Sequence, residues 1–292
     1  MRMRAVRFEI TVVTLGWMTL LLLMLTLMIP SSSHAAIFFD DSFETCVVGG
    51  GASFPCEGWN DFGQEVAGVS DVVTSPTFSG SKSFQQTLTH AGLPTGNVYK
   101  PSIYKSFTPR DHIFFRWANK YSVPYQSCLI NGMSKSVRLK ISQGYPLIWI
   151  ANYFGRYSVF VEAPYYSTTK RFDTGVSVTS GNWDQLEAEW KLNTPGRADG
   201  LLRFWVNGVL LVEELNKEWR GPFPDSVHPI YGPNYPTPST AQISNTQIYV
   251  QCGVGNIWYD RFAVGDTRIG LTTGQPRSDT TPPASPQGLQ AR

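Results

Sequence analysis

The stretch 183–215 constrains the fold of this chain more than any other part, because it combines strict alternation with two turn signals. Every second residue from Leu186 to Leu192 is apolar and the residues between them are polar, which predicts a strand with one buried and one solvated face. A loop with Pro195 and two glycines follows, and Asn207-Gly208 lies between two further apolar runs. This dipeptide favours a type I′ turn, because both central positions need φ > 0. The stretch therefore predicts an antiparallel three-stranded meander.

Composition points to the same class of structure for the whole chain. Aromatic residues make up 13% of it and charged residues 16%, with 26 Gly and 20 Pro in 292 residues. Many aromatics and many turn formers favour short strands over helices. We therefore predict an all-β fold.

The residue motifs of the meander resemble those of a known family. Asn193-Thr194-Pro195-Gly196, then Asp199-Gly200, then Trp205-Val206-Asn207-Gly208 is similar to secreted polysaccharide-lyase-like domains of the concanavalin A-like jelly-roll class. In particular it resembles the alginate and glucuronan lyases of polysaccharide lyase family 14. The resemblance implies a two-sheet antiparallel β-sandwich over residues 36–272. It speaks for fold more than for function, because one scaffold hosts many sites.

The N-terminal residues 1–35 have the three regions of a signal peptide. Three arginines precede an apolar run at 10–29, and Ser33-His34-Ala35 supplies the small residues that signal peptidase needs before Ala36. The alternative is an uncleaved anchor, because the run is about long enough to span a bilayer. With cleavage, we expect a protein that is secreted or held at the cell surface or in the periplasm, with no membrane contact.

The C-terminal residues 273–292 lose all strand pattern. The segment Asp279–Leu289 resembles the opening of a fibronectin type III module, which implies a longer, multidomain chain with a monomeric jelly roll. The alternative is a plain Pro/Ser linker.

Charge excludes one class of partner. The chain has 24 Lys and Arg against 22 Asp and Glu, and removal of the signal peptide leaves 21 of each. Nucleic-acid binding would favour a basic excess, so we expect no nucleic-acid partner. A local basic patch remains compatible with an anionic polysaccharide.

Four cysteines in an exported chain predict disulfides. We favour Cys46–Cys56, which closes a glycine-rich loop, and Cys128–Cys252. Free buried thiols are the alternative. A zinc site is not expected, because no C-x-x-C or paired His spacing is present.

The segment 136–142 is predicted to carry the site. Ser136, Arg138 and Lys140 alternate with apolar residues, so they are expected on one face of a strand, with aromatic residues on the strands that follow. Aromatic rings stack on pyranosides, and Arg binds a carboxylate bidentately, so this face suits a sugar acid. The alternative is an ordinary solvated face. The candidate catalytic residues are Ser136, Arg138, Tyr153 and Tyr157, and the candidate substrate-binding residues are Lys140, Trp149, Arg156, Glu162 and Arg220.

The resemblance also implies a reaction, β-elimination in a polyuronate. It needs a group that neutralises the sugar carboxylate, a base for the C5 proton and an acid for the leaving oxygen. Ser136-Val137-Arg138 matches the Ser-x-Arg strand of these lyases, but Phe160-Val161-Glu162 stands where they have Tyr-x-Tyr. The sequence therefore predicts polysaccharide binding first, with an active lyase and a structural surface protein as alternatives.

Two sets of carboxylates suggest sites of another kind. Asp40, Asp41 and Asp260 are conceivable ligands of a structural Ca²⁺, against a solvated turn as the simpler interpretation. Glu187 and Glu189 share a strand face as glucanase carboxylates do, but the flanking glucanase signature is absent, so a solvated face is expected. No other cofactor is predicted.

The loop 219–240 is rich in Pro and aromatic residues and lacks periodicity. A loop of this length in a compact domain is commonly a lid or a binding loop. We expect it to cover one end of the groove.

Overall fold

The computed structural model describes residues 36–49, 56, 58–61, 68–92, 102–129, 132–142, 147–162, 170–220, 227–228, 232–233, 239–250 and 252–272. The predicted signal peptide and fibronectin-like start lie outside these residues, as does most of the loop 219–240. Within the described ranges, no helix has the length and apolar character needed to cross a membrane.

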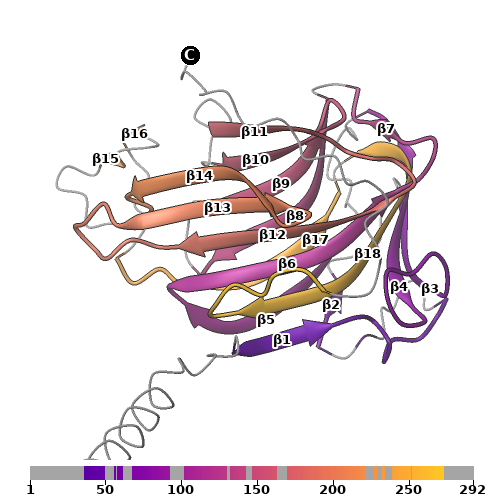
Figure 1. The fold of residues 1–292 in the computed structure, drawn as a ribbon, viewed down its shortest axis with the longest axis horizontal. Helices are drawn as coiled ribbons and strands as arrows, with labels where there is room; N and C mark the ends of the chain where they lie inside the picture. Colours follow the sequence, from indigo (N-terminus) through magenta and orange to yellow (C-terminus); the bar gives the residue numbers. More distant parts are fainter. Residues whose placement is uncertain are drawn as a thin grey trace, which may run out of the picture. The chain divides into compact units, whose positions relative to one another are not determined.

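The chain forms two antiparallel sheets, which confirms the predicted all-β sandwich (Figure 1). Sheet A has the order β14-β13-β12-β6-β18-β4-β3, with β1 and β7 also paired to β18, and sheet B has the order β11-β10-β9-β8-β17-β5-β2. The strands of sheet A are β1 (Ile37–Asp41), β3 (Gly68–Val73), β4 (Ser83–His90), β6 (His112–Tyr121), β7 (Gln126–Ser127), β12 (Trp183–Lys191), β13 (Gly200–Val206), β14 (Val209–Lys217) and β18 (Gly253–Gly265). Those of sheet B are β2 (Asn60–Asp61), β5 (Ser102–Arg110), β8 (Met133–Ile141), β9 (Leu147–Tyr153), β10 (Arg156–Glu162), β11 (Lys170–Ser177) and β17 (Ile243–Tyr249). A separate pair joins β15 (Val227–His228) to β16 (Gly232–Pro233).

The predicted meander is confirmed as β12, β13 and β14. The turn between the last two strands has φ of 51° at Asn207 and 81° at Gly208, as a type I′ turn requires. The four alternating apolar residues at 186–192 all lie in the core between the sheets, where they pack with apolar residues of both sheets. They are Leu186, Ala188, Trp190 and Leu192.

Both predicted disulfides are confirmed. Cys46 pairs with Cys56 and Cys128 pairs with Cys252, and the described part of the chain has no free cysteine. Cys252 separates β17 of sheet B from β18 of sheet A. The second disulfide therefore fixes the connection at which the chain changes sheet.

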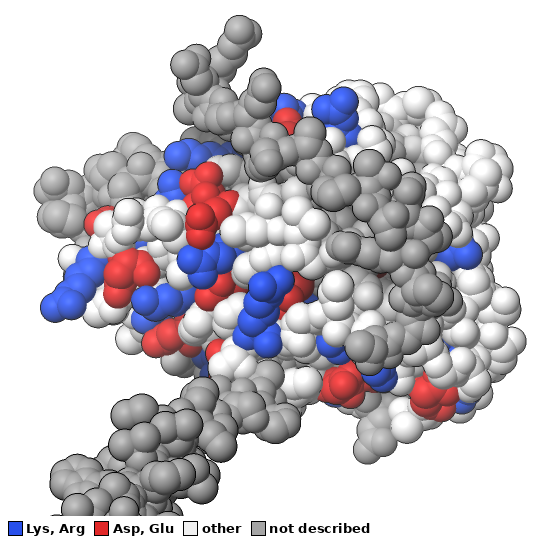
Figure 2. All heavy atoms as spheres, viewed as in Figure 1, with Lys and Arg blue, Asp and Glu red and all other residues white. Residues whose placement is uncertain are grey.

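The prediction that Glu187 and Glu189 are solvated is wrong, since both are buried. The segment 266–272 lies against the face of sheet A that points away from the core, where Glu187 accepts hydrogen bonds from the N–H groups of Ile269 and Gly270. Glu189 bonds to His112 at 2.8 Å and to Arg203 at 3.1 Å. Figure 2 shows Lys and Arg interspersed with Asp and Glu on the left of the view, where Figure 1 places β12, β13 and β14. The two glutamates are therefore occupied in structural contacts.

A β-bulge in β8 changes which side chains share a face. Lys135 pairs with Ala151 and Val137 with Ile150, so one residue of β9 lies opposite two residues of β8. The extra residue is Ser136, and it points with Val137 into the interior. The predicted polar row therefore keeps Arg138 and Lys140 but loses Ser136 and gains Lys135.

Candidate functional site

The face of sheet B that points away from the core carries a small aromatic cluster of its own. Trp149 and Phe160 are buried there with Ala151, separately from the core between the sheets. They lie directly opposite each other on β9 and β10, and Trp149 lies opposite Arg138 on β8. Tyr249 of β17 contacts Trp149, with 5.1 Å between the ring centroids.

Arg138 is the centre of this surface. Its guanidinium carbon lies 4.6 Å from the Trp149 ring centroid and 5.3 Å from that of Tyr249. Nη2 of Arg138 donates to Oε1 of Gln247 on the neighbouring strand. The Trp149 ring has a second cation contact, because the ammonium of Lys135 lies 4.1 Å from its centroid. We call Lys135, Arg138, Trp149, Gln247 and Tyr249 the Arg138 cluster.

Lys140 continues the cationic row two residues beyond Arg138. It is half-buried, and burial, together with the positive charge of Arg138, lowers the pKa of its ammonium group. Two cations that repel each other in this way are stabilised by an anion bound between them. The row thus favours an anionic ligand on electrostatic grounds.

Two of the candidate catalytic residues, Ser136 and Tyr157, do not join this cluster and point into the interior instead. Ser136 Oγ lies 3.0 Å from the hydroxyl of Tyr259 in the interior. The hydroxyl of Tyr157 donates to Asp184 at 2.8 Å, and burial and the Asp184 charge raise the pKa of Tyr157 well above its ordinary value. The bulge in β8 and the alternation of β10 account for the two orientations.

The remaining residues of sheet B are placed around the cluster. Tyr153 points to the same side, in ring contact with Phe160, and the guanidinium carbon of Arg171 lies 4.3 Å from the Tyr153 ring centroid. Arg156 is exposed at the turn between β9 and β10, where it pairs with Tyr153. Glu162 ends β10, and its side chain lies outside the described residues.

Arg220 is a structural residue in this fold. It is buried, and its guanidinium donates to the carbonyls of Asn193 and Ala241 and to the carboxylate of Asp111. These contacts fix the chain that follows β14. The expected role of Arg220 in substrate binding is therefore replaced by a role in holding backbone segments together.

The three predicted metal ligands do not form a cation site. Asp41 accepts from the N–H of Phe43 and from the indole N–H of Trp59, and buried Asp260 accepts from the N–H groups of the 78–79 turn. Across the described ranges, no group of three or more His, Cys, Asp or Glu side chains is arranged to hold a metal. The carboxylates bind backbone and indole N–H groups instead.

Three members of the cluster were missed at the level of sequence. In a regular strand, Lys135 and Arg138 would point to opposite faces, because they are three residues apart. They share a face only because of the bulge, and nothing in the sequence marks it. Gln247 and Tyr249 follow Asn245 at period two along β17, which is a readable signal of a polar face. What the sequence lacks is the pairing of β17 with β8, which places Gln247 opposite Arg138.

Comparison with solved structures agrees with this architecture. The endo-β-1,4-glucuronan lyase of the fungus Trichoderma reesei has a TM-score of 0.53 at 14% identity, over 80% of this chain and 96% of that one. The fold is a concanavalin A-like jelly roll. The cellulose-induced protein Cip1 has a TM-score of 0.54 at 14% identity, over 80% and 100% of the two chains. The alginate lyase vAL-1 from a Chlorella virus has a TM-score of 0.50 at 13% identity, over 72% and 93%.

No protein-family model and no curated protein sequence matches the chain. At these identities the likeness concerns the jelly roll alone. The function of the Arg138 cluster has to be argued from its own chemistry.

Proposed function

We propose that this jelly-roll domain acts outside the cytoplasm and binds a polysaccharide that contains uronic acids, through the Arg138 cluster. The observation that carries the proposal is the guanidinium of Arg138, which is held by Gln247 against the rings of Trp149 and Tyr249. An Arg that is fixed in this way loses little freedom on binding, and its planar fork fits a carboxylate. The two disulfides support an oxidising compartment.

Further support comes from the mixture of groups on this face. Tyr153 and Tyr249 are partly exposed and offer ring surface for the apolar face of a pyranose. Lys140 adds a second cation beside Arg138. A sugar acid can interact with both the rings and the cations, whereas a neutral glycan gains nothing from the positive charge of this face.

The test is affinity electrophoresis and calorimetry of the domain with glucuronan and alginate, and with cellulose oligomers as the neutral comparison. We expect binding of the polyuronates that weakens as salt rises, because screening reduces the attraction between charges. Arg138→Gln should weaken binding by about tenfold or more, since a bidentate charged contact is lost.

The matched control is Arg203→Gln, which removes the same charge from the face of sheet A that points away from the core. It should leave binding unchanged. Retention of the Arg138→Gln variant at the strength of the wild type, or equal loss in both variants, would contradict the proposal.

Lyase activity is the second candidate, and Tyr249 favours it. Its ring lies 5.3 Å from the guanidinium carbon of Arg138, so a phenol lies beside the group that would neutralise the carboxylate. Such a phenol can transfer a proton in β-elimination. The same polymers should then give a rise in ultraviolet absorbance from the unsaturated product, and Tyr249→Phe should abolish it while binding persists. Binding without any rise in absorbance leaves the binding module as the function.

A further inference from the structure

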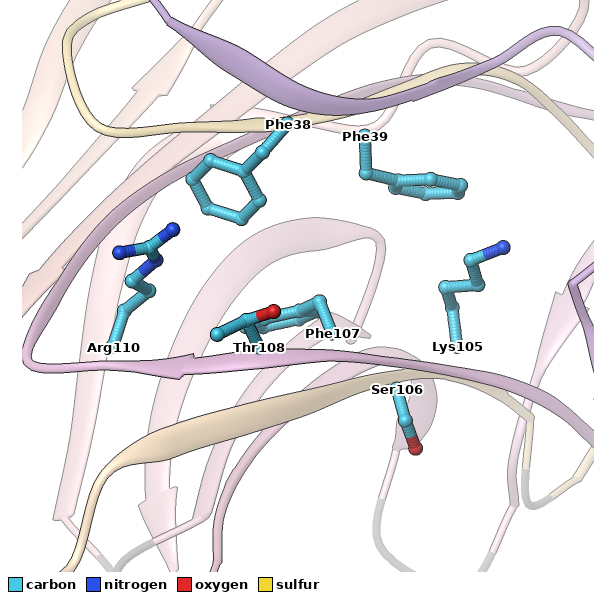
Figure 3. A pocket seen from close by; sticks show the side chains of 7 residues that line it. All are labelled: Phe38, Phe39, Lys105, Ser106, Phe107, Thr108 and Arg110. Carbon is cyan, nitrogen blue, oxygen red and sulfur yellow. The ribbon is translucent and has the colours of Figure 1, made fainter.

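A cavity of about 460 Å³ lies between β1, which pairs with sheet A, and β5, which belongs to sheet B (Figure 3). Ligand pockets commonly have volumes of about 300–1,000 Å³, so the space is large enough for one or two sugar units. It is separate from the Arg138 cluster, with which it shares no residue. We call it the β1–β5 cleft. Its lining consists of Phe38, Phe39, Lys105, Ser106, Phe107, Thr108 and Arg110.

A bulge in β1 directs two successive phenylalanines into the cleft. Ile37 pairs with Gly265 and Phe39 with the adjacent Val264, so Phe38 is an extra residue on β1. Successive residues of a regular strand point to opposite faces, whereas here both rings project toward β5, as Figure 3 shows. Phe38 meets Phe107 with 6.0 Å between ring centroids. The cleft therefore has aromatic surface on both of its walls.

Two cations flank these rings. The ammonium of Lys105 lies 4.8 Å from the Phe39 ring centroid, and the guanidinium carbon of Arg110 lies 5.3 Å from that of Phe38. In the part of the chain that the structure describes, neither cation has a carboxylate within ion-pair distance. Asp41 feels the charge of Lys105, but its carboxylate is engaged by Phe43 and Trp59.

We propose that the β1–β5 cleft is a second binding site, for a short acidic oligosaccharide whose carboxylates contact Lys105 and Arg110. The phenyl rings would pack against the apolar faces of the sugar rings, and the cations would select for charge. An acidic peptide could satisfy the cations, but it would leave the aromatic walls without flat partners. The inference takes its ligand class from the proposed function, although it rests on different residues.

The experiment uses a trimer of β-1,4-linked glucuronate, with cellotriose as the uncharged trimer of the same linkage. Calorimetry should give two glucuronate trimers per wild-type chain. The double variant Lys105→Gln/Arg110→Gln should bind one, with the cleft weakened by about tenfold or more. Arg138→Gln should also bind one. In an NMR titration of the Arg138→Gln variant, the amide signals of Phe38 and Phe39 should shift with the glucuronate trimer and remain in place with cellotriose.

Two further variants separate charge from fold. Thr108→Glu keeps both cations and adds an anion at an exposed position of the cleft, so it should also weaken this site. Lys191→Gln/Arg197→Gln removes two positive charges near the turn after β12 and should change neither site. Thermal unfolding should be the same for all variants within a few degrees.

The outcomes distinguish the two proposals. Unchanged trimer binding in both cleft variants overturns the cleft, and the Arg138 cluster then stands or falls by its own variant. Binding that survives Arg138→Gln in full and disappears in the cleft variants supports the cleft and contradicts the Arg138 cluster. Binding of a poly-glutamate peptide that is lost in the cleft variants, without any binding of the glucuronate trimer, overturns the sugar as ligand of the cleft.

Discussion

Asn193 shows what one buried amide can hold together. Its Oδ1 accepts from the N–H groups of Trp219 and Arg220, at 2.6 and 2.8 Å. Its Nδ2 donates to the carbonyls of Thr194 and Arg220, at 3.1 and 2.9 Å. All four bonds go to backbone groups, so the side chain replaces a stretch of strand pairing where the chain leaves β14.

Replacing Asn193 by Leu, which has a similar size, should therefore destabilise the fold strongly. The change leaves buried backbone donors and acceptors without partners, which costs about 3 kcal/mol. Urea unfolding measures the loss, and Asn182→Leu, at an exposed turn position, is the control. A loss below that of the control would show that water satisfies these groups.

Asp260 is a residue whose charge opposes folding. It is fully buried, with Oδ2 accepting from Phe78 and Ser79 and Oδ1 from Arg261. Burial raises its pKa from 3.8 to about 6, in spite of these hydrogen bonds. The native state therefore holds the proton of Asp260 more tightly than the unfolded chain does. The stability that this protonation adds to the native state is complete below the unfolded pKa and is lost as pH rises through 6.

This gives a pH-dependent prediction. The free energy of unfolding of the wild type, relative to Asp260→Asn, should fall by about 2 kcal/mol between pH 4 and 7, since most of a pKa shift of about two units lies within this range. Urea titrations of both proteins across this range test it. Parallel curves would mean that the carboxylate titrates at its ordinary pKa.

Regular strands were predictable from the sequence, and irregular ones were not. The meander and its type I′ turn follow from alternation and from Asn207-Gly208, because those signals act within a few residues. The bulges in β1 and β8 depend on how a partner strand lies against them, so Phe38 and Lys135 were placed only by the structure. Arg220 was misjudged for the same reason, because its partners Asp111 and Asn193 are distant in sequence.

The segment 266–272 behaves as an element without strand pairing of its own. Glu187 accepts from Ile269 and Gly270, and Gln185 accepts from the N–H and hydroxyl of Thr272. Two side chains of β12 thus supply the acceptors that a neighbouring strand would otherwise provide.

The double variant Gln185→Ala/Glu187→Ala should release this segment and leave the sandwich folded. Hydrogen exchange at the amides of Ile269, Gly270 and Thr272 should accelerate by about tenfold or more, because local opening no longer breaks these bonds. Glu213→Ala, which removes an exposed glutamate of β14, is the control. Unchanged exchange would assign the docking to apolar contacts alone.

At the scale of the whole sandwich, the two disulfides should differ in importance. Cys46 and Cys56 are 10 residues apart, whereas Cys128 and Cys252 are 124 apart. A longer closed loop removes more entropy from the unfolded chain.

Replacing Cys128 and Cys252 by Ala should cost about 5 kcal/mol of unfolding free energy, and replacing Cys46 and Cys56 about 3 kcal/mol. Guanidinium unfolding of the two double variants gives the comparison. An equal or reversed order would show that native contacts, rather than loop length, set the contribution of each bond.

The bulge in β8 has a consequence for how this surface can diversify. If Ser136 were deleted, Lys135, Val137 and Arg138 would form a regular alternating strand, and each would keep the face that it has now. A descendant that lost this residue would therefore shorten the spacing of its outward charges and lose the hydrogen bond between Ser136 and Tyr259 in the interior. The loss of a single codon could thus change the pattern of charge on this face without any need to rebuild the rest of the sheet.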